Sequence, residues 1–243
     1  MAFNKKEFID FIIENGVIGF YEEPVRLKSG RLSPYYINWR NVAEDVYLID
    51  RLSDFILEFC RDNNIKPDCF YGVPEGATKI GIITQYKYAK RDPNLAKGKY
   101  PLPMGRGKIK EHGIEKDRFF LGIPKGKTAI IEDVVTTGGS LLSEIEKLGK
   151  FGIEICAVLV LTDRLELRDD GKTVREIIEE LGYKYYSLSD SKEIIEEYLR
   201  GKKLKKEILE MLKEYIREYT VFRLDIGNKL NSLCLDRMAN VKK

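Results

Sequence analysis

Short apolar runs alternate with amphipathic stretches along most of the chain, and this alternation predicts strands separated by helices. Runs typical of buried strands lie at 68–73, 128–131, 155–161 and 183–188. Stretches with apolar residues at helical spacing lie at 44–63, 77–91, 141–150 and after Thr173. Strands joined by crossover helices predict an α/β fold with a central, mainly parallel sheet and helices on both faces.

Capping residues predict where two of the helices start, and apolar faces support two helices near the start of the chain. Asn4, followed three residues later by Glu7, is typical of a capping box, and Thr173 with Glu176 has the same spacing. The first helix then presents apolar side chains on one face, at Phe8, Phe11 and Ile12. The apolar face of the stretch 44–63 comprises Val46, Ile49, Leu52, Ile56, Phe59 and Cys60.

Two segments fall outside this alternation. Residues 92–120 hold three prolines, several glycines and many charges, which predicts a long mobile loop of functional importance. After residue 200 an apolar stripe predicts one more helix, packed on its own domain or on a partner. The stripe comprises Leu204, Ile208, Met211, Leu212, Tyr215 and Tyr219.

Composition narrows the class of protein. The 243 residues, 43% apolar and 33% charged, suffice for one large or two small domains with a sizeable core. No apolar run is long enough to span a membrane, and the N-terminus has no secretory pattern. Four scattered cysteines fit the cytoplasm, and one histidine excludes a site with several histidine ligands. The net charge of +3 comes from residues 201–243, which carry a surplus of five basic residues.

The segment 128–140 has the pattern of an anion-binding loop. A buried strand ends in Glu132 and Asp133, and the turn Thr136-Thr137-Gly138-Gly139-Ser140 then opens a helix. Glycines allow close backbone approach, and the free N–H groups at the helix start attract an anion. Two acids beside a phosphate make sense if they accept hydrogen bonds from ribose hydroxyls or help to hold a cation. The whole string therefore predicts a sugar-phosphate site rather than an ordinary polar turn.

Residues 131–140 closely resemble the diphosphate-ribose (PRPP) motif of type I phosphoribosyltransferases, and further segments resemble the orotate branch of that family. Leu27 to Asn38 is similar to its LKSGRxSPYxxN segment, and Gly72 to Ala77 partly matches its GxPxxA-type loop. Arg106 to Gly113 resembles its mobile catalytic loop, RKExKxHG, and Leu161 to Arg164 resembles its strand end followed by Asp-Arg. The resemblance covers about residues 4–200.

The resemblance assigns roles to particular residues. It implies that PRPP is bound by Lys28, Arg106, Lys108, Glu132, Asp133, Val134, Thr136, Thr137, Gly138, Gly139 and Ser140. It implies catalytic roles for Lys110, His112 and Asp133, and contact with orotate for Tyr36, Thr136 and Arg164. Mg²⁺ is the implied cofactor, bound largely through substrate oxygens and waters, so no metal ligand is assigned to the chain. In two places the chain departs from the pattern. Gly107 and Lys108 replace the usual lysine and acid, and Gly76 stands where bacterial relatives often carry a lysine.

The resemblance also implies a domain plan. A phosphoribosyltransferase domain is expected over 1–200, with a small N-terminal hood over about 1–42 and a mobile catalytic loop at 105–118. Residues 201–243 are expected to form a basic helical extension. The catalytic loop of the family closes over the neighbouring subunit, so the resemblance implies a homodimer. A cytoplasmic location is expected from the scattered cysteines, and neither a membrane nor nucleic acid is expected as a partner.

The residues alone leave plainer interpretations open. Lys28 with Arg31 would also suit a solvated turn, residues 106–113 a solvated basic hairpin, and Arg164 a structural ion pair with Asp163. Three functions remain to be separated. They are transfer of the phosphoribosyl group to orotate, transfer to another base, and non-catalytic binding of PRPP or a nucleotide by a regulator.

Overall fold

A four-stranded parallel sheet lies at the centre of the protein. The structure is a computed structural model, and it describes residues 2–224. The sheet order is β3-β6-β7-β8, with bounds Cys69–Gly72, Thr128–Val135, Ile155–Asp163 and Tyr185–Asp190. In the register of the two central strands Ile131 lies beside Leu159, and Val135 lies beside Asp163. All four strands lie in regions where the apolar runs predict them.

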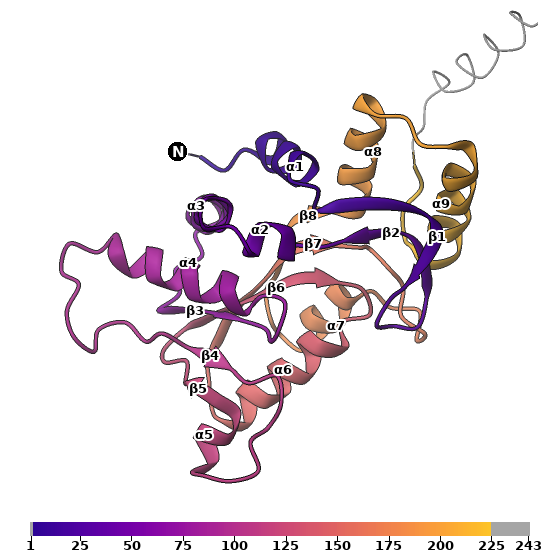
Figure 1. Cartoon of the computed structure of the whole chain (residues 1–243). Coiled ribbons are helices and arrows are strands. Elements are labelled where there is room, and N and C mark those ends of the chain that lie inside the picture. Colours follow the sequence, from indigo (N-terminus) through magenta and orange to yellow (C-terminus); the bar gives the residue numbers. More distant parts are fainter. Residues whose placement is uncertain (1, 225–243) are drawn as a thin grey trace, which may run out of the picture.

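Helices cover both faces of this sheet (Figure 1). Alternate residues of each strand enter two separate apolar cores. Ile131 and Leu159 pack with α3 (Val46–Asp62) and α4 (Thr78–Lys90). Ile130 and Val158 pack on the other face with α6 (Gly139–Lys150) and α7 (Val174–Glu180). The predicted α/β architecture with helices on both faces is therefore confirmed.

The predicted helix starts are present. Asn4 accepts a hydrogen bond from the backbone N–H of Glu7 over 3.2 Å and so caps α1 (Lys5–Glu14). At α7, Thr173 and Glu176 form a complete capping box. The expected apolar face of α3 is wrong at Val46, which is 84% exposed. This residue directly follows the cap at Asp45, so its side chain lies outside the packed turns of the helix.

An antiparallel hairpin of β1 (Ile18–Arg26) and β2 (Leu32–Ile37) lies beside the sheet, followed by the short α2 (Arg40–Ala43). The chain ends its described part with α8 (Ser191–Gly201) and α9 (Lys206–Tyr219). Helix α9 contacts both strands of the hairpin (Figure 1). Ile208, Leu212 and Tyr215 of the predicted stripe are buried there, so the described part of the extension packs on its own domain.

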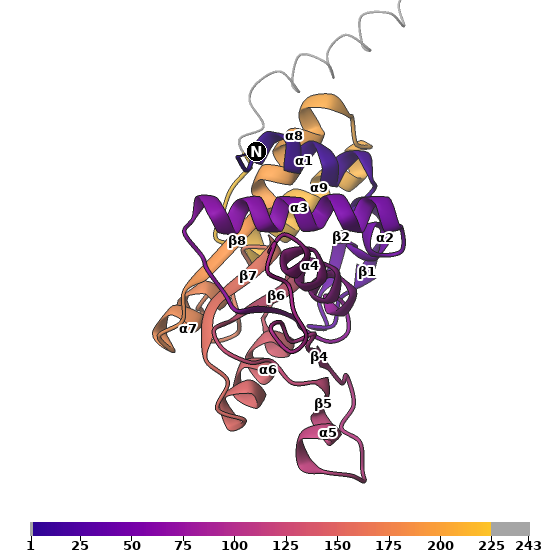
Figure 2. The ribbon, with the colours of Figure 1, turned by 90° about the vertical axis from the view of Figure 1, so that its left-hand side faces the viewer.

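The segment 92–120 is less irregular than its composition predicts. Two very short strands, β4 (Met104–Gly105) and β5 (Phe120–Gly122), pair antiparallel, and α5 (Glu115–Phe119) lies between them. Figures 1 and 2 both show α5 and the loop before it extending away from the body of the protein. Within residues 2–224 no helix is long and apolar enough to cross a membrane.

Candidate functional site

A cavity of about 710 Å³ lies at the carboxyl ends of β3, β6 and β7, where parallel sheets bind ligands. It brings together three segments that the sequence singles out, namely 27–38, 72–77 and 132–140. Of the predicted site residues, its lining includes Lys28, Tyr36, Arg106, Glu132, Asp133, Val134, Thr136, Thr137, Gly138, Gly139, Ser140 and Arg164. One wall thus comes from the hairpin and the opposite wall from the loop before α6.

The loop 136–140 is shaped by one glycine. Gly138 has a φ of +72° and is the residue immediately before α6. A Cβ atom there would lie 2.7 Å from both methyl groups of Val174, too close for any other residue without a shift. Arg168 holds the loop from behind, since its Nη1 donates to the carbonyl of Thr137 over 2.5 Å. The first N–H groups of α6 therefore border the cavity beside three hydroxyl side chains.

Lys28 reaches across the cavity from the hairpin. Its Nζ donates a hydrogen bond to Oγ of Ser140 over 2.7 Å. This contact joins two residues that are 112 positions apart and places an ammonium group at the anion loop. The arrangement suits a ligand with more than one phosphate, because the cation and the N–H groups at the start of α6 can attract negative charge together.

The acid pair lies at the end of β6. Glu132 is buried, and burial together with the charge of Asp133 raises its pKa well above the usual value of 4.5. Asp133 packs against the loop after β3, where a Cβ on Gly76 would lie 2.3 Å from its Oδ2. A lysine at position 76 would therefore need this carboxylate to move. The pair offers carboxylate oxygens that can accept hydrogen bonds from a diol.

Two nitrogens of the Arg164 guanidinium, Nε and Nη2, are hydrogen-bonded within the protein. It is 1% exposed, and its Nε donates to Oε1 of Glu166 over 2.6 Å. Its Nη2 donates to Ser33 over 2.9 Å and to Tyr215 over 3.2 Å. Asp163 instead accepts from Tyr185, so the simple pairing of Asp163 with Arg164 is wrong. Among residues 2–224 no hydrogen bond uses Nη1 of Arg164, which is the donor left for a ligand.

Tyr36 lies on β2, opposite Gly19 of β1, and lines the same cavity. Its ring is partly buried. An aromatic face close to an arginine that retains a free donor suits a flat, acidic ring, because the ring can stack while its carboxylate binds the guanidinium.

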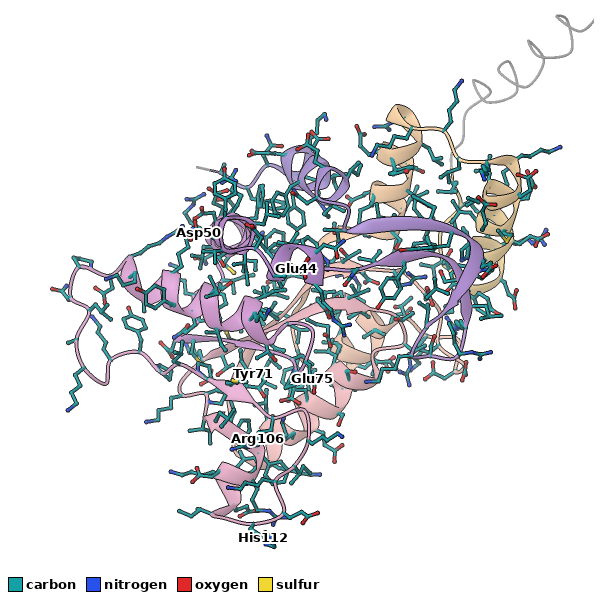
Figure 3. The ribbon with its side chains drawn as sticks, viewed as in Figure 1. Glu44, Asp50, Tyr71, Glu75, Arg106 and His112 are labelled. Atoms are coloured by element: carbon teal, nitrogen blue, oxygen red, sulfur yellow. The ribbon has the colours of Figure 1, made fainter. Side chains whose placement is uncertain are left out.

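Only part of the predicted catalytic loop lines the main cavity. Arg106 lines the main cavity and also a second one of about 400 Å³, which it shares with Lys110. Lys108, Lys110 and His112 do not line the main cavity, and Figure 3 shows His112 at the far tip of the loop. A Cβ on Gly107 would lie 2.6 Å from Oε1 of Glu75, so this glycine lets the loop approach the segment after β3.

Several polar residues at the cavity were given no role by the sequence. Asn38 is the last residue of the hairpin motif and Arg40 lies two positions after it, and this position was the available signal for them. Glu75 lies inside the loop 72–77. Glu144 lies one turn into α6, where it accepts a hydrogen bond from Tyr71. Nothing in the local pattern distinguishes Glu144 from an ordinary surface residue of a helix.

Within residues 2–224 no group of three or more histidine, cysteine or acidic side chains is arranged to hold a metal ion. The carboxylates of Glu132 and Asp133 are nevertheless donors of the kind that Mg²⁺ accepts. Their chemistry is therefore compatible with a magnesium ion that a diphosphate substrate would bring with it.

Comparisons with known proteins agree on one family. An orotate phosphoribosyltransferase of Methylococcus capsulatus is 30% identical over 217 residues, covering 88% of this chain and 97% of the relative. One of Buchnera aphidicola is 31% identical over 219 residues, covering 89% of this chain and 99% of the relative. A share of 88% is more than 200 of the 243 residues, so the similarity extends beyond the motifs into the segment after residue 200.

The comparison with solved structures supports the fold. The crystal structure of an orotate phosphoribosyltransferase from Francisella tularensis superposes with a TM-score of 0.64 at 22% identity, covering 88% of this chain and 99% of the other. The predicted type I phosphoribosyltransferase fold is thereby confirmed. No family model matches the sequence. On the extent and identity of its similarity to curated relatives, the chain belongs to the orotate phosphoribosyltransferase family.

Proposed function

We propose that this protein transfers the 5-phosphoribosyl group from PRPP to orotate, giving orotidine 5′-phosphate and pyrophosphate for pyrimidine synthesis. The observation that carries the proposal is one cavity with an anion loop at 136–140, an acid pair beside it and a retained arginine donor opposite. Phosphate, ribose and a carboxylated base need these three features in this order. Family membership supports the same substrates.

In this proposal the loop 136–140 binds the 5′-phosphate and the acid pair binds the ribose hydroxyls. Lys28 and Arg106 attract the diphosphate. Tyr36 lies along the base, and Nη1 of Arg164 donates to the orotate carboxylate. Val134 and Thr136 contact the bound ribose. Mg²⁺, when bound with the substrate, offsets the negative charge of the departing pyrophosphate.

The chemistry needs positioning more than a protein nucleophile, because orotate itself attacks the anomeric carbon. The transition state resembles an oxocarbenium ion, and the charge on the leaving pyrophosphate must be stabilised. We propose that Lys110, His112 and Lys108 do this after the loop 105–118 closes, with Lys110 or His112 supplying charge or a proton. Asp133 would stabilise the ribose as positive charge develops.

We further propose a cytoplasmic homodimer in which this loop closes over the partner subunit. His112 at the loop tip lies far from the cavity of its own chain, and that separation supports the proposal (Figure 3). The test is size-exclusion chromatography with light scattering, followed by mixing of two inactive variants. Asp133→Asn and Lys110→Ala subunits should regain part of the activity when mixed, and absence of any recovery would contradict a shared loop.

The reaction itself is tested by the ultraviolet absorbance of orotate. Adding PRPP and Mg²⁺ to the protein should lower this absorbance, and the Asp133→Asn variant is the control for contaminating activity. If absorbance is unchanged, purine bases are tried next. Turnover of a purine would indicate another base, whereas binding of PRPP without any turnover would indicate a regulator.

A further inference from the structure

Three elements far apart in the sequence hold the Arg164 guanidinium. Ser33 belongs to β2, Glu166 follows β7, and Tyr215 lies on α9. The guanidinium also stacks on the ring of Tyr35, with 3.9 Å from Cζ to the ring centre. Helix α9 is therefore in direct contact with the arginine that faces the cavity.

Glu166 is the centre of this cluster. It is 1% exposed and accepts from Nε of Arg164 over 2.6 Å, from Nη1 of Arg31 over 2.8 Å and from the hydroxyl of Tyr215 over 2.8 Å. Arg31 is three residues from Lys28 in the same turn and also lies against the ring of Tyr219. One buried carboxylate thus binds two arginines, one from the turn of the hairpin and one from the end of β7.

The hydroxyl of Tyr215 has two roles in the cluster. It donates to Glu166 and accepts from Nη2 of Arg164. Two of the three guanidinium nitrogens, Nε and Nη2, are therefore bound by the protein, and the planar group cannot rotate without breaking one of these bonds. The remaining nitrogen, Nη1, is kept for the cavity.

We propose that Tyr215 is a positioning residue for recognition of the base carboxylate, which makes α9 part of the base subsite. This inference rests on the proposed transfer to orotate. Tyr215 does not touch the substrate. It acts by holding Arg164 in the rotation that presents Nη1. Hydrogen bonds to charged groups are among the stronger ones in proteins, so loss of the hydroxyl should weaken carboxylate binding about tenfold.

The experiment compares two nucleotides that share phosphate, ribose and pyrimidine and differ only in the carboxylate. Orotidine 5′-phosphate and uridine 5′-phosphate are titrated by calorimetry into the full-length protein and its Tyr215→Phe variant, which keeps the ring and removes the hydroxyl. The variant should bind orotidine 5′-phosphate about tenfold more weakly and uridine 5′-phosphate within twofold of the wild type. Tyr219→Phe is the matched control. It lies on the same helix with its hydroxyl beside Glu218, and it should change neither affinity.

Each other outcome contradicts the proposal in a recognisable way. Equal weakening of both nucleotides, or a lowered Tm with equal affinity losses, would show that Tyr215 is only structural. Unchanged binding of both would show that Arg164 needs no such support. If the wild type itself does not prefer orotidine 5′-phosphate over uridine 5′-phosphate, the assignment of orotate fails, and the positioning role fails with it. If the wild type prefers orotidine 5′-phosphate but Tyr215→Phe binds both nucleotides as the wild type does, the positioning role fails and the proposed reaction is unaffected.

Discussion

Lys28 on the hairpin donates a 2.7 Å hydrogen bond to Ser140 at the start of α6. This single contact spans the cavity and joins its two walls. A lysine in that place would bind a diphosphate more strongly than it binds a hydroxyl, because a hydrogen bond between an ammonium group and an anion has charge on both partners.

Lys28→Ala should therefore weaken use of PRPP. We expect the KM for PRPP to rise about tenfold, while the KM for orotate changes little. Steady-state kinetics at saturating orotate measure the effect. Lys150→Ala, which removes an exposed lysine at the far end of α6, is the control and should leave both constants unchanged. Equal increases in both KM values would argue against a specific contact with the diphosphate.

Asp133→Asn and Lys110→Ala should each lower turnover by about 10²–10³-fold, the usual effect of removing one group that stabilises charge in a transition state. Circular dichroism should show both variants folded. Lys116→Ala is the matched control for the loop, since this residue lines the second cavity beside Lys110 but has no proposed role. Near-normal rates in both variants would refute the assignment of these two residues.

Gly138→Ala and Gly139→Ala form a matched pair of substitutions. At Gly138 the added methyl meets Val174 and the positive φ is unfavourable, so the free energy of unfolding should fall by about 1–3 kcal/mol. At Gly139 nothing lies within 4 Å of the added atom, and the helical backbone accepts alanine. Chemical denaturation distinguishes the two. Equal losses in both variants would mean that the loop geometry does not depend on Gly138.

The pKa of Glu132 gives a prediction for stability against pH. Burial, with the charge of Asp133 as the second cause, raises this pKa above its unfolded value of 4.5, and Lys28 opposes the shift. Between the two pKa values the folded protein holds a proton that the unfolded chain has lost. The free energy of unfolding should therefore decrease as pH rises through this range.

Glu132→Gln removes this titration while keeping the shape of the side chain. Urea denaturation from pH 4.5 to 8 should show the wild type losing stability relative to the variant as pH rises. Parallel profiles for the two proteins would show that Glu132 does not hold the proton.

Glu166→Ala should be severely destabilising. It leaves Arg31 and Arg164 without their shared carboxylate in a buried place, and loss of one partner in such a cluster costs roughly 3–5 kcal/mol. Denaturant midpoints measure the loss. Glu180→Ala, which breaks an exposed pair with Lys172, should cause a much smaller change. Similar losses of stability in both variants would show that the Glu166 cluster contributes no more to stability than an exposed ion pair.

Local patterns predicted most of the fold because each central strand and its following helix have a clear period of their own. The loop 136–140 could be predicted for the same reason, since a strand, two acids and a glycine turn are contiguous. The very short strands β4 and β5 could not be predicted, because two or three residues have no measurable period. Val46 was misplaced because spacing alone does not say where the packed turns of a helix begin.

The base side of the cavity depends on contacts that no local pattern contains. Arg164 and Tyr215 are 51 positions apart, and Ser33 is 131 positions from Arg164. Motif resemblance pointed to Arg164 but not to its partners. The interpretation of Arg164 as paired with its neighbour Asp163 was wrong, because Asp163 accepts a hydrogen bond from Tyr185 instead.

The place of Tyr215 near the end of the described chain has a consequence for biosynthesis. During translation the ribosome releases the phosphate loop long before it releases α9, so the nascent polypeptide acquires the means to grip a sugar phosphate first. A domain folds as a unit, so the hydrogen bonds of Tyr215 to Arg164 and Glu166 form only after α9 has emerged. A truncation ahead of α9 would remove Tyr215 and leave Glu166 and Nη2 of Arg164 each without one hydrogen-bond partner.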